Sequence, residues 1–493
     1  MNLLDQAVSF FNPVAGAKRA RARLLESMFQ DNVRRYEAAS QSRRTADWRA
    51  HSTSSNTEIS EASVLLRNRS RDLTRNNPHA KKAVATLVTN VVGSGIKPSI
   101  QVGGGRNAKN TKAAWRKWAE TTECDFERRK TFAGIQAMAM RAVAESGECF
   151  IRARRDTKAM PIPLRLQVLE SDFLDIHRDG LPTTGGGYIM QGIEFDADGR
   201  RVAYWLHEVH PGDNRIYKSM VSNRVPADEI LHVYYAERPG QIRGVPVGVS
   251  SMLRLKSLDE YDDAELMRKK VAACFGVFVT DSADALPGEA NETGGYPIER
   301  VEPGMIEYLK PGQTVSLSSP PPSEGYSEYS TAFLRSIAAG YGVTYEAMTG
   351  DLSNVNFSSG RMGWIEMGKV IAEYQEQMMI PVLCAGVWDW FKQAATIAGF
   401  GKMDAEATWT TPRRPMLDPV KETKGLSEQV RNGFTSWQDA VRQQGDDPEL
   451  LAAEMKTDAD LFVKLGFMLS CDPRFDTNRV NPDAKPPPVP PKK

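Results

Sequence analysis

Residues 326–380 read YSEYSTAFLRSIAAGYGVTYEAMTGDLSNVNFSSGRMGWIEMGKVIAEYQEQMMI, and this stretch predicts two helices joined by a short polar break. Apolar side chains recur in both arms at steps of three or four residues, which places them on one face of a helix. These positions are Phe333, Ile337, Tyr341, Tyr345 and Met348 in the first arm, and Trp364, Met367, Ile371, Tyr374 and Met378 in the second. At a rise of about 1.5 Å per residue, each arm spans roughly 30 Å. The pattern alone therefore predicts an antiparallel helical hairpin with a polar tip.

Glycine and proline set the expected limits of the two arms. Gly340 and Gly342 weaken the first helix and are expected to let it bend. Residues 351–359 are rich in turn-forming residues and form the break. Pro381 disfavours helix at the residue before it, so the second arm is expected to end near Ile380.

The same stretch resembles a family signature. Residues 336–361 read SIAAGYGVTYEAMTGDLSNVNFSSGR. In lambda-type phage portal proteins a helix ends in aa.lGv.ye.l, then comes D.s..NyssaR, and another long helix follows. In that family the break is a tunnel loop that points at the DNA in the central channel of a ring. The resemblance implies that the corresponding loop here consists of Asp351, Leu352, Ser353, Asn354, Val355, Asn356, Phe357 and Ser358. Its tip would lie near Asn354, Asn356 and Phe357. An ordinary helix pair with a solvated turn is the alternative interpretation of the pattern.

Other stretches resemble this family in the order in which the family has them. Residues 69–101 contain RNNPHAKKAVATLVTNVVGSGIKP, and residues 192–213 contain GIEFDADGRRVAYWL and HPGD. Residues 225–246 read VPADEILHVYYAERPGQIRGVP, and a further match lies in residues 408–455. Together the matches extend over about residues 61–470, which is nearly the whole chain.

Local patterns predict the elements around these motifs. Pro78 lies between two expected helices, and alternating apolar residues from Gly147 onward predict strands. Residues 196–199 are expected to form the turn of a β-hairpin. Asp418 and Pro419 lead into another helix, and Thr435 or Ser436 is expected to cap the next one.

The fold is implied by the resemblance and not by the composition. It is an α+β multidomain portal fold with an α/β wing, a helical stem, a β-containing clip and an α-helical crown, assembled as a ring. The implied segments are a basic N-terminal arm (1–60), the wing (61–248), the first stem helix (249–274), the clip (275–325), the second stem helix (326–350), the tunnel loop (351–358), a long wing helix with the following core (359–407), the crown (408–470) and a proline-rich tail (471–493).

The first stem helix carries acidic residues before basic ones, an order that suits the helix dipole. It also suits side-by-side packing of copies, in which the acids of one subunit meet the bases of the next. The residues expected to make these contacts are Asp259, Glu260, Asp262, Asp263, Glu265, Arg268, Lys269 and Lys270. A solvated surface helix is the alternative.

Size and charge limit the class of protein. A chain of 493 residues with 41% hydrophobic residues is expected to form two or more folded domains. It has no apolar run of about 18 residues, so we expect no membrane span. The first residues are apolar and the bases follow, the reverse of a secretory signal. The net charge of +1 is low for a protein that grips nucleic acid but is compatible with a channel through which DNA slides. The basic arm would be a solvated segment or a contact with an anionic partner.

Catalytic and metal-binding motifs are absent from the sequence. The five cysteines have no metal-ligand spacing and fit reduced thiols: Cys124, Cys149, Cys274, Cys384 and Cys471. His207 and His210 lack the HExxH spacing of a zinc site, and residues 103–105 form no dinucleotide fingerprint. There is no phosphate-binding P-loop and no nucleophile elbow. We therefore expect no enzymatic activity, no cofactor and no metal; an ATPase that pumps DNA would be another protein.

By resemblance, the protein would be a phage portal that nucleates head assembly, docks the terminase, passes double-stranded DNA and holds the tail connector. The implied partners are further copies of itself in a ring, usually a dodecamer, double-stranded DNA, the terminase large subunit, the major capsid and scaffolding proteins, and a head-completion or adaptor protein. Its place would be the portal vertex of the virion, and the host cytoplasm during assembly. The alternatives are another virion structural or connector protein without a DNA-facing loop, a cytoplasmic enzyme, or a monomeric nucleic-acid binder with a basic arm.

Overall fold

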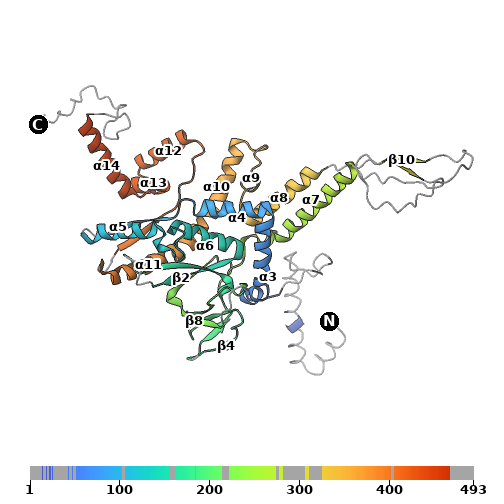
Figure 1. Cartoon of the computed structure of the whole chain (residues 1–493), viewed down its shortest axis with the longest axis horizontal. Helices are drawn as coiled ribbons and strands as arrows, with labels where there is room; N and C mark the ends of the chain where they lie inside the picture. The colour runs from blue at the N-terminus through green and yellow to red at the C-terminus, as the bar shows by residue number, and fades with distance from the viewer. Residues whose placement is uncertain are drawn as a thin grey trace, which may run out of the picture. The chain divides into compact units, whose positions relative to one another are not determined.

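A computed structural model describes residues 51–102, 106–155, 161–183, 185–213, 221–273, 277–280, 306–309, 325–400 and 405–466, with a few isolated positions before residue 50. The chain divides into two units, Met1–Glu58 and Ile59–Lys493, and the fold described below is that of the second unit (Figure 1). Residues 103–105, most of the basic arm, most of the clip and the proline-rich tail lie outside the described residues.

The chain is mixed α and β, and mostly helical. The helices are α3 (Ser55–Asn76), α4 (Pro78–Val91), α5 (Arg106–Ala119), α6 (Phe132–Ser146), α7 (Met252–Ala273), α8 (Tyr326–Tyr341), α9 (Tyr345–Thr349), α10 (Phe357–Tyr374), α11 (Ala385–Ala395), α12 (Pro419–Arg431), α13 (Trp437–Gln443) and α14 (Pro448–Leu465). Short 3₁₀ turns are η2 (Thr122–Cys124), η3 (Ser171–Phe173), η4 (Ala227–Glu229) and η5 (Val247–Ser251). Two π-helical segments are η6 (Gln375–Cys384) and η7 (Thr396–Phe400). None of the helices in the described ranges combines the length and the apolar character that crossing a membrane requires.

Within the described residues the strands form four small sheets. Three antiparallel strands have the order β3 (Arg165–Glu170), β2 (Glu148–Arg154), β9 (Ile230–Tyr234). A five-stranded meander has the order β4 (Leu181–Pro182), β5 (Tyr188–Met190), β6 (Ile193–Phe195), β7 (Arg201–His207), β8 (Ser222–Pro226). β1 (Lys97–Val102) pairs antiparallel with β12 (Ala405–Thr410), and β10 (Val277–Thr280) pairs parallel with β11 (Ile306–Leu309). The predicted hairpin is confirmed, because the 196–199 turn joins β6 to β7.

The main core lies among α4, α5, α6, η6 and α11. At its centre Trp115 contacts Phe132, Trp388 and Phe391 edge-on, with ring centroids 4.9–5.6 Å apart. The indole of Trp118 is buried and donates to the carbonyl oxygen of Leu164 at 2.8 Å. Aromatic side chains of this size contribute much of a core's stability, and residues far apart in sequence meet here to provide it.

Side-chain caps begin the helices where the sequence predicted. Asn77 accepts from the backbone N–H of Ala80 and Pro78 occupies the first turn of α4, so α3 and α4 are separate helices as predicted. Asp418 caps α12 and Ser436 caps α13, which confirms both of these predicted starts.

The first arm of the predicted hairpin is two helices rather than one. Gly342 has a left-handed backbone (φ +68°) and ends α8, and Thr344 then caps α9. The apolar spacing predicted one continuous face through Met348, but glycine at a left-handed position stops a helix whatever follows it. Ile337, Tyr341 and Met348 are nevertheless all buried.

The second arm continues through Pro381, which contradicts the expected end near Ile380. Here the chain takes the wider π-helical turn of η6, and α11 follows without a break. A change of hydrogen-bond register accommodates a residue that has no N–H to donate. The side chain of Gln375, buried at the start of η6, donates to the carbonyl oxygen of Val91 at 2.7 Å and holds the junction to α4.

Candidate functional site

The predicted loop lies between α9 and α10 and is shorter than expected. Gly350, with φ +78°, ends α9, and α10 begins at Phe357. Residues 351–355 therefore form the turn, Asn356 is the N-cap of α10, and Phe357 and Ser358 belong to its first helical turn. Of the eight residues predicted for the loop, the first five form the turn, Asn356 caps α10, and the last two belong to α10.

Hydrogen bonds within the loop give it a defined shape. The carboxylate of Asp351 accepts from the hydroxyl and the backbone N–H of Ser353 and from the hydroxyl of Tyr345. The hydrogen bonds from Ser353 and then Tyr345 lower the pKa of Asp351, so this exposed carboxylate stays charged. Asn356 and Ser359 form a reciprocal capping box. The amide oxygen of Asn356 is therefore engaged in the cap, whereas Asn354 is exposed at the turn.

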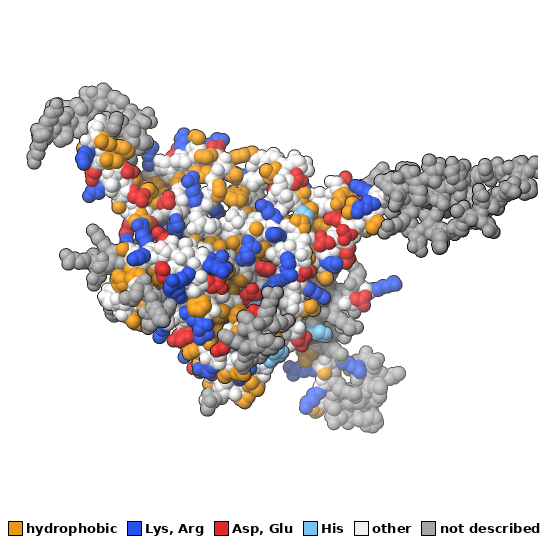
Figure 2. Space-filling model, viewed as in Figure 1, with side chains coloured by type: hydrophobic (Ala, Val, Ile, Leu, Met, Phe, Trp, Pro, Cys, Tyr) orange, Lys and Arg blue, Asp and Glu red, His pale blue; other side chains and the backbone are white. Residues whose placement is uncertain are grey.

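Apolar side chains are exposed beside these polar groups. Leu352 is 66% exposed and Phe357 is 58% exposed. Met362 and Ile365 continue the exposed apolar surface along α10. In Figure 2 apolar side chains appear along the upper edge of the molecule, where Figure 1 places α9 and α10. Exposed apolar side chains gathered on a loop and the helix that follows it favour a contact with another protein.

The predicted stem helices α7 and α8 lie side by side (Figure 1). Tyr261 stacks on Tyr326 with ring centroids 5.8 Å apart, and the Tyr326 hydroxyl donates to Asp262 at 2.9 Å. Arg254 donates to the hydroxyl of Ser336 farther along the pair. This packing orders the two helices against each other within one chain.

Several charges predicted to meet another subunit are paired inside the chain. Asp259 accepts from the side-chain amide of Asn77 at 2.7 Å, although burial raises the pKa of Asp259. Glu265 is buried and accepts two hydrogen bonds from Arg268, at 2.7 and 2.9 Å. Further contacts join Glu260 to Lys256 at 3.3 Å and Lys269 to Glu265 at 3.9 Å. Asp263 and Lys270 are exposed. The pairs within α7 follow from helical spacing, whereas the contacts of Asp259 with Asn77 and of Asp262 with Tyr326 depend on where α4 and α8 lie.

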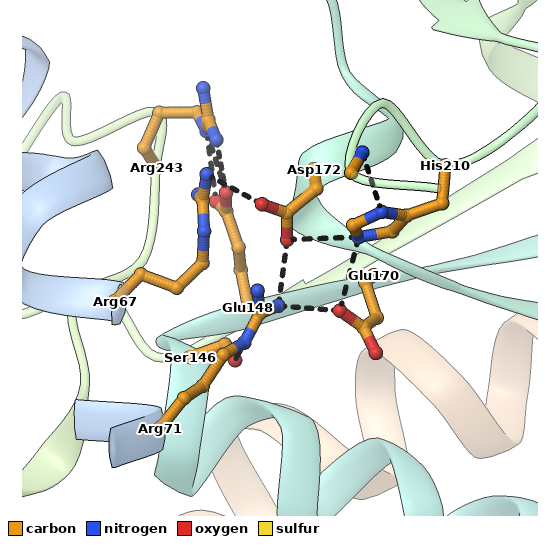
Figure 3. A network of polar contacts seen from close by, with 9 residues as sticks. Arg67, Arg71, Ser146, Glu148, Glu170, Asp172, His210 and Arg243 are labelled. Atoms are coloured by element: carbon orange, nitrogen blue, oxygen red, sulfur yellow. Dashed lines mark hydrogen bonds and ion pairs between the residues drawn. The ribbon is translucent and has the colours of Figure 1, made fainter. Parts of the chain in front are cut away.

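A buried ionic network that the sequence did not predict lies at the start of β2 (Figure 3). Glu148 accepts from Arg243 at 2.8 and 3.0 Å and from the backbone N–H of Gly244 at 2.9 Å. Nε2 of His232 lies 3.0 Å from the same carboxylate. Burial opposes the charge of Glu148, but Arg243 and His232 outweigh it and hold the pKa of this carboxyl well below its ordinary value. Burial lowers the pKa of His232 to about 4, so the imidazole is neutral at neutral pH.

A second, more exposed cluster adjoins this network. One guanidinium nitrogen of Arg71 lies 2.7 Å from both Glu170 and Asp172, and Nε2 of His210 lies 3.5 and 3.8 Å from the same two carboxylates (Figure 3). Donor atoms of Glu170, Asp172 and His210 lie within 4.8 Å of one another, which is close enough for a metal ion. Arg71 already supplies the positive charge between the two carboxylates, so a metal would have to displace it. His207 is not part of this cluster, so the two histidines do not form a common ligand set.

Comparison with known proteins gives consistent matches. The family model described as "Phage portal protein, lambda family" matches residues 41–375. A "Probable portal protein" of Halomonas phage phiHAP-1 is 26% identical over 461 residues, covering 88% of each chain. "Portal protein B" of Escherichia phage lambda is 24% identical over 446 residues, covering 78% of this chain and 81% of that protein.

Among solved structures, the neck of an empty GTA particle is similar at 16% identity with a TM-score of 0.41, covering 81% of this chain and 95% of the other. A chain of the virion of a native gene transfer agent particle has the same identity and TM-score, covering 78% and 94%. Scores at this level do not establish a shared fold.

Proposed function

This chain belongs to the lambda family of phage portal proteins, and on that premise we propose that it forms the ring-shaped DNA channel at one vertex of a phage capsid. Portal proteins of tailed phages are structural head–tail connectors and not enzymes. The family match runs through the stretch that carries α8, α9, the turn at 351–355 and α10, and it is the observation on which the proposal rests.

We assign the parts of the portal as follows. The wing comprises the segment from α3 to β9 together with α10, η6 and α11; α7 and α8 are the stem, with the clip between them; and α12 to α14 are the crown. The turn at 351–355 is the tunnel loop that faces DNA. Its exposed position and its two helical ends support this role, because an exposed turn fixed at both ends can protrude into a channel without unfolding.

In a ring, weak contacts from each subunit are enough to guide DNA. Each subunit contributes the same turn, so a single contact from Asn354 to a phosphate becomes a collar around the duplex. Uncharged amide and hydroxyl groups add little of the counterion release that makes basic proteins bind DNA tightly. Contact of this kind guides DNA and still lets it slide.

Terminase and the head-completion protein would dock at the clip, and the crown would face the capsid interior with the major capsid and scaffolding proteins nearby. These partners, the dodecameric ring and the location at the portal vertex follow from the family and are part of the proposal.

Negative-stain electron microscopy of the purified protein tests the proposal directly. Rings with a central hole wide enough for a duplex are the expected result. Compact single particles at all concentrations would contradict it, and would favour a monomeric nucleic-acid binder.

A second experiment tests the loop and distinguishes a portal from a connector without a DNA-facing loop. Asn354→Asp adds one negative charge per subunit at an exposed turn position that caps nothing. Rings should still form, but packaging in a phage complementation assay should fall because the collar now repels phosphate. Asn356→Asp is the matched control for folding, since aspartate also caps helices well. Normal packaging by the Asn354→Asp variant would mean that the loop does not face DNA.

A further inference from the structure

Beside α10 lies a groove that none of the residues described by the structure fills. It lies between α10 and residues 414–422, has a volume of about 440 Å³, and we call it the α10 groove. Trp364, Ile365 and Leu417 supply apolar lining, and Arg361, Lys369 and Arg414 supply positive charge. Ile365 is 44% exposed and Leu417 is 46% exposed.

The cations of the groove differ in whether they are already paired. Arg414 donates to the carbonyl oxygen of Gly368 and is held by the helix. Lys369 pairs with Glu366 at 2.7 Å. Arg361 is exposed and, within the described ranges, makes no hydrogen bond or ion pair. Glu422 also lines the groove, but its carboxylate accepts from the backbone N–H of Asp418. The groove therefore suits a ligand that joins an apolar group to an acid next to Arg361.

The turn at 351–355 presents such a pair. Asp351 is an exposed, charged carboxylate, and the adjacent Leu352 is an apolar side chain that the chain itself leaves largely in water. The hydrogen bonds from Ser353 and Tyr345 fix the carboxylate in place, so little conformational freedom is lost when it binds a partner.

The Asp351 carboxylate is not paired with Arg361 of its own chain and instead accepts hydrogen bonds from Ser353 and Tyr345. Between the turn and the groove lies the first part of α10, and the capping box at Asn356 holds the turn at the helix N-terminus. Arg361 and Lys369 are five and 13 residues beyond Asn356, which places them roughly 7–20 Å along the helix axis. A contact that fills the groove with this turn would therefore join two copies. Because the two surfaces differ, the contact is heterologous, and a heterologous contact forms a ring when the rotation that it sets between neighbours closes.

We infer that the α10 groove receives the Asp351–Leu352 turn of a second copy of this chain, with Leu352 against Trp364 and Ile365 and the Asp351 carboxylate against Arg361. This inference rests on the proposed ring, and it names the surface that orients neighbouring loops. It also gives Asp351 and Leu352 a role in assembly and leaves Asn354 for the contact with DNA.

Charge reversal tests the pairing. Asp351→Arg and Arg361→Asp should each lower the fraction of protein in rings several-fold near the assembly midpoint, measured by mass photometry without DNA. The double variant should restore assembly, because the pair is re-formed with its charges exchanged. Asp198→Arg, an exposed change in the β6–β7 turn, is the matched control and should assemble normally. Single variants that assemble like the wild type, or a double variant no better than the singles, would overturn the inference.

Cross-linking provides an independent test that does not depend on how strongly the charges act. Leu352→Cys and Ile365→Cys are placed on differently tagged, co-expressed subunits in which Cys274 and Cys471 are serine; Cys124, Cys149 and Cys384 are buried. Oxidation should join the two tags, and replacing Ile365→Cys by the exposed Ile397→Cys should abolish the product. Rings without this cross-link would refute the inference and leave the proposed function intact. Wild-type protein that forms no rings would refute the proposed function instead.

Discussion

At the scale of single residues, the fold around the start of β2 depends on Glu148. This carboxylate is buried and is the common acceptor for Arg243, the N–H of Gly244 and His232. A buried pair adds little stability compared with an apolar replacement of both partners, but removing one partner leaves the other charge buried and unpaired.

Glu148→Gln should therefore destabilise the protein by about 3–5 kcal/mol, because it leaves the buried Arg243 without a counter-charge. Urea unfolding at neutral pH measures this difference. Asp198→Asn removes an exposed ion pair with Arg200 and should cost at most about 1 kcal/mol. Equal effects of the two substitutions would mean that the Glu148 pair is not buried in solution.

The pH dependence of stability should reflect His232. Its pKa is about 4 in the folded chain and 6.5 unfolded, so between these values the unfolded state binds more protons. The contribution of His232 is fully present above pH 6.5 and is lost as the pH falls towards 4.

His232→Gln keeps an amide that can donate to Glu148 but does not titrate. The slope of unfolding free energy against pH between 6.5 and 4 should be shallower for this variant than for the wild type. Parallel curves for the two proteins would show that His232 is not buried and neutral.

At the scale of elements, residues 412–414, which lie between β12 and α12, pack so closely against three glycines that a Cβ on any of them would make a tight contact. A Cβ on Gly93 would lie 3.1 Å from Pro412, one on Gly445 would lie 2.8 Å from the backbone of Arg413, and one on Gly368 would lie 2.3 Å from Arg414. Each glycine belongs to a different part of the fold: the turn after α4, α10, and the turn before α14. Residues 412–414, which precede α12, are therefore in close contact with the turn after α4, with α10 and with the turn before α14.

Gly368→Ala should lower the melting temperature, because its Cβ meets the Arg414 guanidinium and displaces its hydrogen bond to α10. In an Arg414→Ala background the same substitution should become stabilising, since alanine exceeds glycine in helix propensity by about 1 kcal/mol. Gly425→Ala in α12 is the control. A Cβ on Gly425 would lie more than 4 Å from any atom outside its own stretch of helix, so this substitution should stabilise the protein in either background. If Gly368→Ala destabilised the protein in both backgrounds, contact with the Arg414 guanidinium would not be the cause.

At the scale of the whole molecule, apolar surface remains uncovered on several elements. On α7 these side chains are Leu253, Leu266 and Met267, and α14 exposes most of its length. Scattered apolar side chains are normal on a monomer, but repeated exposure along whole helices favours further protein contacts. Glu265 is paired with Arg268, and Asp262 accepts from Tyr326, both within one chain. We therefore expect apolar contacts to contribute more than ion pairs to the binding energy of the expected stem interface.

Met267→Glu should therefore weaken ring assembly and leave the thermal stability of the unassembled chain nearly unchanged, since this side chain is 60% exposed. Mass photometry over a concentration series measures the first effect and calorimetry of the dissociated chain the second. Ile397→Glu, at a similarly exposed position away from α7, serves as the control. Unaltered assembly of Met267→Glu would exclude this face of α7 from the ring interface.

Local chemistry in the sequence determined the helix starts at Pro78, Asp418 and Ser436, the 196–199 hairpin and the family to which the chain belongs, because caps, turns and motif residues act on their near neighbours. Only the tertiary structure decided what distant residues do to one another. In the folded chain Glu148 pairs with Arg243, 95 positions away, and Asp259 pairs with Asn77. The helix continues past Pro381 as a π-helical segment. Burial and charge pairing depend on which segments pack together, and that choice is made by the whole core rather than by any one stretch.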